Sequence, residues 1–341
     1  MEVKKSQIQE NLFAYLENRL IGQTLSAFLQ KKLKISKSSA YKKISGEISL
    51  SLTELEYLIK ECEVPVTEII ETPYAISFQS DGLRSMPQHP LQYLKNILKH
   101  LKFLRESKEV DFMYLSNDIP LFHLLQCPKI LTLKLYIWDL TNWQTQIDSP
   151  AGFSIDLYNE NTAEFEQIRT EMLDCYLEYS GIEVWSSRIF DSLIEQLKFV
   201  INSMMIRNKE DILVILDELD TLFEYLKSCA VDGVKKGINT RSEEVKEITI
   251  YENQIIDNVN LIYAKTPKMQ IIYSMLDSPN FIYSTDQKIC EKAGVWVDNV
   301  LAHSRIISKE GTQNREKFFR LLEKRLEKAR KEITALLDYF F

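Results

Sequence analysis

Residues 23–70, QTLSAFLQKKLKISKSSAYKKISGEISLSLTELEYLIKECEVPVTEII, decide how the N-terminal part of this chain folds. Their apolar residues recur at helical spacing in short runs. Ser36 precedes the second run and is a good N-cap, because its side-chain oxygen can accept a hydrogen bond from a free amide of the first turn. Gly46 follows that run and is a favoured helix stop. The stretch therefore predicts short helices with tight breaks, and it leaves Lys37 and Ser38 exposed on a first turn.

Further helices are expected on both sides of this pair. Residues 6–19 precede it, and the apolar residues that share one helical face there are Ile8, Leu12, Phe13 and Leu16. A third helix of residues 23–70 has an apolar face made by Leu52, Leu55, Leu58 and Ile59, and Pro65 with Val66 starts a last short helix. We therefore expect a five-helix domain over residues 1–72.

This pattern of helices, cap and glycine stop resembles the helix-turn-helix domain of lambda-repressor-like (Cro/repressor-type, Xre-like) transcriptional regulators, over about a fifth of the chain. In that family the second helix of the motif enters the major groove of double-stranded DNA. By position, the resemblance implies base contacts by Lys37, Ser38, Tyr41 and Lys42. It implies phosphate contacts by Ser26 and Ser45.

The charge pattern is local. Residues 31–43 contain six lysines and no acidic residue. Because phosphate neutralisation supplies most non-specific affinity for DNA, this run agrees with the resemblance, and Lys31 is expected to contact a phosphate. Residues 1–72 carry ten Lys plus Arg and ten Glu, so the formal net charge of -7 lies in residues 73–341. An acidic body is repelled by DNA, so we expect only the N-terminal domain to bind it.

The remaining chain divides into three parts. Residues 73–88 contain prolines without a sustained period and are typical of a linker. Residues 89–240 predict a helical regulatory domain of antiparallel hairpins, with a short strand over residues 110–115. Residues 117–143 resemble a segment of long regulators that carry the same N-terminal motif. Gly181 and Asn208 to Glu210 are expected to mark turns between helices.

From Val245 onward the composition changes to β-branched and aromatic residues, in the runs ITIY, NVNLIYA, MQIIYSML and NFIYST. These runs predict a small antiparallel sheet of three or four strands, followed by helices over residues 286–303 and 313–341. The expected fold class is therefore mainly α: a five-helix DNA-binding domain, a helical middle region and a small α+β C-terminal region over residues 241–341. Aromatic residues there either line a pocket for a small-molecule effector, serve a protein effector, or pack in the core; they are Tyr251, Tyr263, Tyr273, Tyr283 and Trp296.

The last helix carries a coiled-coil repeat with alternating spacings of three and four residues, made by Phe319, Leu322, Leu326, Ala329, Ile333, Leu336 and Phe340. The repeat favours self-association, whereas Phe318, Leu321 and Leu337 widen the stripe and favour packing on the chain's own body. Both interpretations remain open from the sequence. A homodimer is expected in either case, because two linked readers recognise two half-sites.

Nothing in the sequence nominates a catalytic residue, a cofactor site or a metal site. The five cysteines show no CxxC spacing, and no glycine-rich phosphate loop accompanies the run LVILDELD at residues 213–220, which keeps helical spacing. The chain has no apolar run long enough for a membrane span, and we expect a cytoplasmic protein. Because no catalytic residue is nominated, we expect that it is not an enzyme. Two alternatives stay open: an interaction scaffold, favoured by Gln30 and Lys43 where the family has small and apolar residues, and an enzyme with an unrecognised site.

Overall fold

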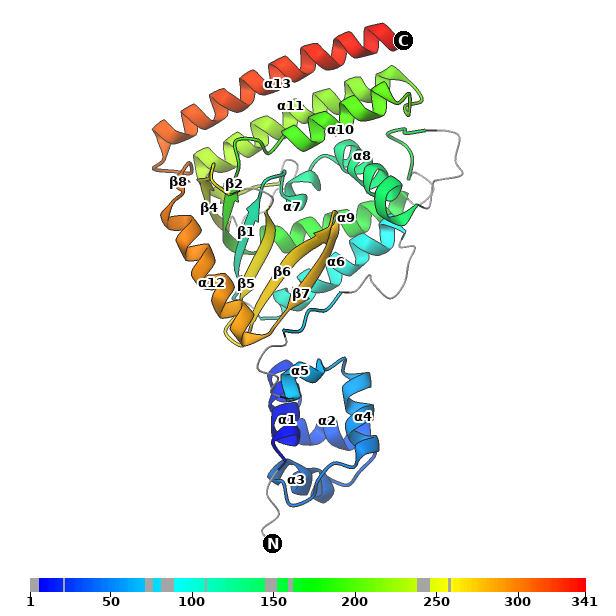
Figure 1. Cartoon of the computed structure of the whole chain (residues 1–341), viewed down its shortest axis with the longest axis vertical. Coiled ribbons are helices and arrows are strands. Elements are labelled where there is room, and N and C mark those ends of the chain that lie inside the picture. The colour runs from blue at the N-terminus through cyan, green and yellow to red at the C-terminus, as the bar shows by residue number, and fades with distance from the viewer. Residues whose placement is uncertain are drawn as a thin grey trace. The chain divides into compact units, whose positions relative to one another are not determined.

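The computed structural model describes residues 6–20, 22–70, 76–80, 89–107, 109–144, 152–158, 162–237, 246–256 and 259–341. The chain forms two compact units (Figure 1). The N-terminal unit comprises Met1–Gln79 with Ser284–Ile289, and the larger unit comprises Ser80–Tyr283 with Cys290–Phe341. Of the expected linker, only residues 76–80 lie within the described part of the chain.

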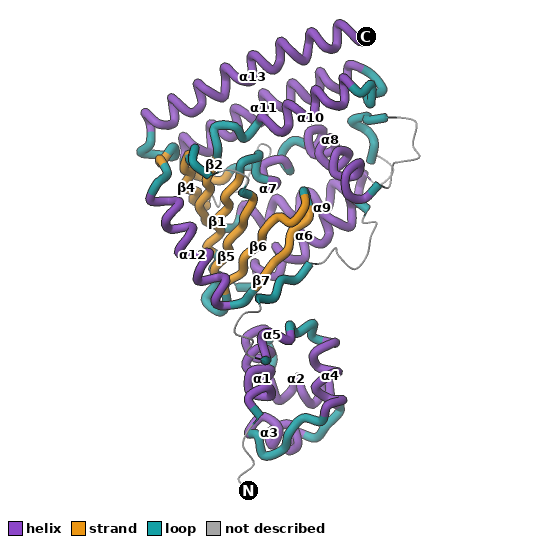
Figure 2. Tube along the Cα trace, viewed as in Figure 1, coloured by secondary structure: helices purple, strands orange, loops and turns teal. Residues whose placement is uncertain are grey.

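In the described part of Met1–Gln79, residues 6–70 are helical apart from the breaks between helices, and residues 76–79 are not helical (Figure 2). Its helices are α1 (Gln7–Arg19), α2 (Leu25–Leu33), α3 (Lys37–Ser45), α4 (Leu52–Glu61) and α5 (Val66–Ile69). Side chains accept hydrogen bonds from first-turn amides of two helices, because Thr24 caps α2 and Ser36 caps α3. Ser51 and Glu54 form a capping box at α4. The apolar stripes meet in one core that contains Leu12, Leu29, Ala40 and Leu58.

The larger unit is built on one mixed sheet, whose order among the described residues is β3-β4-β2-β1-β5-β6-β7, with β8 paired to β4. The strands are β1 (Asp111–Ser116), β2 (Ser180–Trp185), β3 (Val234–Lys235), β4 (Lys246–Glu252), β5 (Asn260–Lys265), β6 (Gln270–Asp277), β7 (Asn280–Ser284) and β8 (Arg305–Ile306). The central strands β1, β2 and β4 run parallel, and β5 and β6 continue the sheet antiparallel.

This sheet corrects two expectations. The C-terminal strands do not form a separate antiparallel sheet, because β4 pairs in parallel with β2 and β5 pairs with β1. The expected boundary between residues 240 and 241 therefore runs through one sheet. Gly181 does not mark a turn but lies in β2, where an added Cβ would be 2.1 Å from the carbonyl oxygen of Phe112. A central parallel strand is covered on both faces and lacks the alternation that identifies a strand from sequence.

Helices cover the sheet and build two cores. The helices are α6 (Pro90–Arg105), α7 (Leu121–Leu124), α8 (Pro128–Trp138), α9 (Thr162–Leu177), α10 (Asp191–Asn202), α11 (Lys209–Asp232), α12 (Gln287–Ala302) and α13 (Thr312–Phe340), with a π-helical turn η1 (Asp139–Trp143) after α8. Helices α6 and α9 enclose one core with β1, β5 and β6. The other core lies between α8, α10, α11 and α13 and includes Ile248 and Ile250 of β4.

Helix α13 decides between the two interpretations of its repeat. The apolar residues of the repeat from Phe319 to Ile333 are buried against α10 and α11. Charges beside the stripe also pair within the larger unit, as Arg325 does with Asp191 at 2.8 Å and Glu332 with Lys198 at 2.7 Å. This face is therefore internal and not a self-association seam, because the wide stripe finds a full apolar surface in its own chain.

Candidate nucleic-acid interface

Helix α3 presents a continuous polar strip to solvent. It begins directly after Ser36, whose Oγ accepts a hydrogen bond from the amide of Ser39 at 3.1 Å, and it ends at Gly46, whose φ is +83°. Lys37, Ser38, Tyr41 and Lys42 are all exposed. Because residues four apart are neighbours on a helix surface, these four side chains form one strip, in which the Lys37 ammonium lies 6.0 Å from the centre of the Tyr41 ring.

The opposite face of α3 holds the helix in place. Ala40 is fully buried, and Lys43 is 7% exposed with its ammonium 2.8 Å from Glu54. Burial alone would raise the pKa of Glu54, but its hydrogen bonds from Lys43 and Ser51 outweigh this and lower the pKa below its usual value. The aliphatic stem of Lys43 therefore fills the position where the family has an apolar residue, and Glu54 pairs with its ammonium. Lys43 is not part of the exposed α3 strip.

Of the two serines predicted to contact phosphates, Ser26 is buried and Ser45 is exposed. Ser26 is buried in α2, and its Oγ accepts a hydrogen bond from Gln30 at 3.3 Å, so its hydroxyl does not lie on the surface. Ser45 is exposed, but its Oγ donates to the carbonyl oxygen of Lys42 at 3.1 Å. Gln30 has a local role, because it closes over Ser26 where a small residue was expected.

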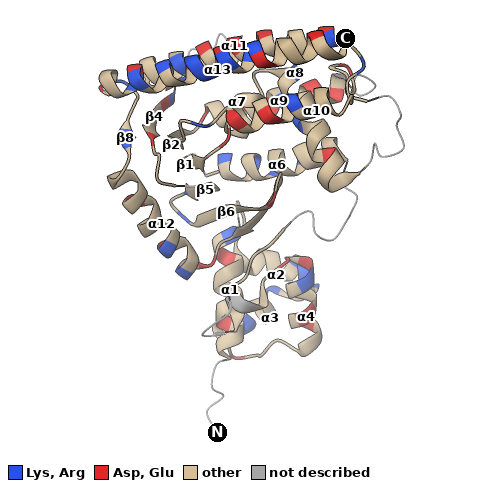
Figure 3. Ribbon diagram, turned by 45° about the horizontal axis from the view of Figure 1, so that its top comes forward, with Lys and Arg blue, Asp and Glu red and all other residues tan. Residues whose placement is uncertain are grey.

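Four lysines of α2, α3 and the turn between them are exposed: Lys31, Lys34, Lys37 and Lys42. None of them has an acidic partner within the described part of the chain, whereas Lys32 pairs with Glu61 at 3.3 Å. In the larger unit, Figure 3 shows basic and acidic residues mixed along helix α13. Lys37 and Lys42 therefore give the α3 strip positive charge that no acidic residue of the described part of the chain neutralises.

A second polar cluster lies inside the larger unit and was not predicted from the sequence. Glu183 on β2 is 1% exposed and accepts hydrogen bonds from Tyr176 and from the indole of Trp185 at 2.7 Å. The Nε2 atom of His123 lies 2.8 Å from a carboxylate oxygen of Glu183, and the buried Lys235 also acts on Glu183 through its charge. A glutamate within an apolar strand was the available signal, but three of its partners come from other parts of the chain, namely α7, α9 and β3.

The electrostatics of this cluster follow from burial and charge. Burial would raise the pKa of Glu183, but the charge and hydrogen bond of His123, the charge of Lys235 and the hydrogen bond from Tyr176 hold it at about 2. Burial lowers the pKa of Lys235 to about 8, although Glu183 acts in the opposite direction. Both His123 and Glu183 are closed to solvent, which favours a structural role.

Lys235 should make the unfolding free energy rise with pH. Its folded-state pKa of about 8 lies below the ordinary value of 10.5, so the unfolded chain binds more protons between these values. The penalty for burying the ammonium is fully present below pH 8 and is relieved as the pH rises to about 10.5. From pH 7 upward, the urea midpoint of the parent should therefore rise relative to that of Lys235→Met. If the midpoints of the two proteins change in parallel with pH, burial of the Lys235 ammonium carries no penalty.

Other predicted sites take these positions. The run LVILDELD lies in helix α11, where Asp220 pairs with Arg330 of α13, so it is a charged helix face. Of the aromatic residues expected to line a pocket, Tyr273 and Tyr283 line a cavity, whereas Tyr263 faces α12 on the other side of the sheet, next to Gly294. None of the helices in the described part of the chain is both long and apolar enough to cross a membrane.

Comparisons with family models, with curated proteins and with solved structures find no match to this chain.

Proposed function

We propose that this chain is a sequence-specific DNA-binding transcriptional regulator, in which α3 enters the major groove of double-stranded DNA and the larger unit is a regulatory body. The observation that carries this proposal is the α3 strip of Lys37, Ser38, Tyr41 and Lys42. A capped helix start that exposes donors on its first turn matches the way in which recognition helices contact base edges. The packed opposite face makes that strip rigid.

The charge distribution supports the same function. Lys31 and Lys34, which precede α3 in the chain, are exposed and can neutralise phosphates. The net charge of -7 belongs to residues 73–341, so electrostatic attraction orients the N-terminal unit toward DNA. We further propose that the chain acts as a homodimer, since one small reader makes few contacts and a pair reads two half-sites. Because the apolar face of α13 packs inside its own chain, a surface other than this face mediates the proposed homodimer.

Single lysine variants test the assignment of base and phosphate contacts. A binding site is first selected from a random duplex library with the whole protein, and affinities are then measured by fluorescence anisotropy at several salt concentrations. Lys37→Ala or Lys42→Ala should weaken binding to the selected site by about 1–3 kcal/mol if the side chain bonds a guanine edge. Lys31→Ala should weaken all sequences alike and reduce the salt slope by roughly one unit.

Lys60→Ala is the matched control, because Lys60 is an exposed lysine of the same unit that pairs with Glu56 on α4. It should leave affinity and salt slope unchanged. If a folded variant with Ala at Lys31, Lys37 and Lys42 binds DNA as the parent does, the recognition assignment is wrong. DNA binding without a steep salt dependence would favour the alternative in which the helical domain is a protein-binding scaffold.

A further inference from the structure

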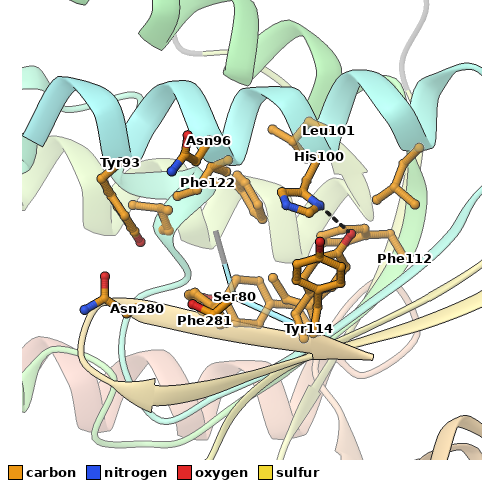
Figure 4. A pocket seen from close by; sticks show the side chains of 16 residues that line it. Ser80, Tyr93, Asn96, His100, Leu101, Phe112, Tyr114, Phe122, Asn280 and Phe281 are labelled. Atoms are coloured by element: carbon orange, nitrogen blue, oxygen red, sulfur yellow. Dashed lines mark hydrogen bonds between the residues drawn. The ribbon is translucent and has the colours of Figure 1, made fainter. Parts of the chain in front are cut away.

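The larger unit contains a partly open cavity of about 90 Å³ between α6 and the sheet (Figure 4). Its 16 lining residues come from α6, α7, β1, β5, β6 and β7, together with Ser80. The wall on one side is α6, which contributes Tyr93, Asn96 and His100. An engineered apolar cavity of about 150 Å³ binds benzene, so this smaller, partly open cavity has room for no more than one aromatic ring, whose substituent would point to the opening.

The lining chemistry selects against charge. No lysine, arginine, aspartate or glutamate is among the 16 lining residues. An ionised ligand would lose its hydration here without gaining a counter-charge, which is strongly unfavourable. The walls are instead aromatic and aliphatic, and their aromatic members include Phe112, Tyr114, Phe122, Tyr273 and Tyr283. Flat apolar walls of this kind match a planar ligand, because aromatic rings stack or meet edge to face.

A few polar groups interrupt these walls and can orient a ligand. Asn96 on α6 and Asn280 on β7 lie at one end of the cavity in Figure 4, and His100 lies toward the other. His100 Nδ1 is 3.3 Å from the hydroxyl of Tyr273. Pockets for small molecules commonly combine apolar walls with a small number of such groups. The carboxamides can each donate and accept a hydrogen bond.

The cavity is held open by contacts around the turn between β6 and β7. The hydroxyl of Tyr93 donates to the carbonyl oxygen of Pro279 at 3.1 Å, which ties this turn to α6. Asn142 of η1 donates to the carbonyl oxygen of Ser278 at 2.5 Å. These bonds fix Asn280 and the start of β7 relative to α6, so the site is formed before a ligand binds.

We propose that this cavity binds an uncharged, planar, largely aromatic small molecule that carries one or two hydrogen-bonding groups. The first segment of the larger unit is Ser80–Tyr283, and both of its end residues line the cavity. After Tyr283 the chain enters the N-terminal unit. A bound ligand thus contacts the polypeptide at two of its crossings between the units. The ligand's action as an effector of DNA binding rests on the proposed function, whereas its binding does not.

The test compares two ligands of similar size that differ in charge. p-Cresol is uncharged at pH 7 and benzoate is ionised, so binding of each to the whole chain, without DNA, is measured by NMR titration. p-Cresol should bind at least about tenfold more tightly, because none of the 16 lining residues that the structure describes offers a counter-charge. Nuclear Overhauser effects should connect its ring protons with those of Tyr273 and Tyr283. Equal affinities, no binding of p-cresol, or contacts elsewhere would overturn the proposal.

A cavity-filling variant gives a second readout. Ile97→Phe places a larger side chain in the lining and should weaken p-cresol binding at least about tenfold, whereas Lys99→Ala, on the exposed side of the same helix, should not change it. Unchanged affinity in a folded Ile97→Phe variant would place the ligand outside the cavity, and if that variant does not fold, the Overhauser contacts of the parent decide. Since no DNA is present, failure here leaves the DNA-binding proposal intact, and failure of DNA binding leaves this site intact.

Discussion

Glu183→Ala should lower the unfolding free energy of the larger unit by about 3–5 kcal/mol, the loss expected when one member of a buried ion pair is removed. The substitution leaves Lys235 buried without its counter-charge and deprives the Tyr176 hydroxyl and the Trp185 indole of their acceptor. Urea denaturation followed by tryptophan fluorescence measures the loss. In the parent, protonation of Glu183 should lower the unfolding free energy as the pH falls from 4.5 toward 2. Glu183→Ala should lack this contribution to the pH dependence.

Glu195→Ala is the control, because Glu195 is an exposed glutamate of the same unit that pairs with Lys198 three residues away. Its urea midpoint should stay close to that of the parent, as expected for surface ion pairs. If Glu183→Ala unfolds at the same urea concentration as the control, the buried cluster does not stabilise the fold.

Ile333→Asp should destabilise the larger unit by at least about 4 kcal/mol, since burying an unpaired charge is among the most costly single substitutions. Ile333 is fully buried where α13 packs on the rest of the unit. Had the repeat been a seam between two chains, the variant would instead remain folded and become monomeric. Thermal unfolding and light scattering on the whole chain therefore distinguish the internal role of α13 from a seam.

Thr334→Asp provides the matched control, because it adds the same charge at the next residue, where α13 is exposed. It should keep both the stability and the mass of the parent. A folded Ile333→Asp variant with half the parent's mass would contradict the internal packing. Light scattering on the parent also tests the homodimer, which a monomeric parent that binds a single half-site tightly would exclude.

The N-terminal helices illustrate what the sequence determined by itself. Caps, glycine stops and helical periods act over three or four residues, so Ser36, Gly46 and the apolar stripes predict α2 and α3 without knowledge of the rest of the chain. The exposed positions of Lys37, Ser38, Tyr41 and Lys42 follow from the same periodicity, and so do the long helices α9, α10 and α11. These features depend on interactions within one element.

Partners that lie far apart in the sequence decided the remainder. Strand β2 joins the sheet between β1 and β4 because of pairings with residues more than 60 positions away, which local composition does not encode. The burial of Ser26 and Lys43 depends on Gln30 and on Glu54 of another helix, and α13 finds its apolar partner in α10 and α11. The cavity beside α6 exists only where six elements converge. A side chain's burial is a property of everything that packs on it, and only the tertiary structure brings those surfaces together.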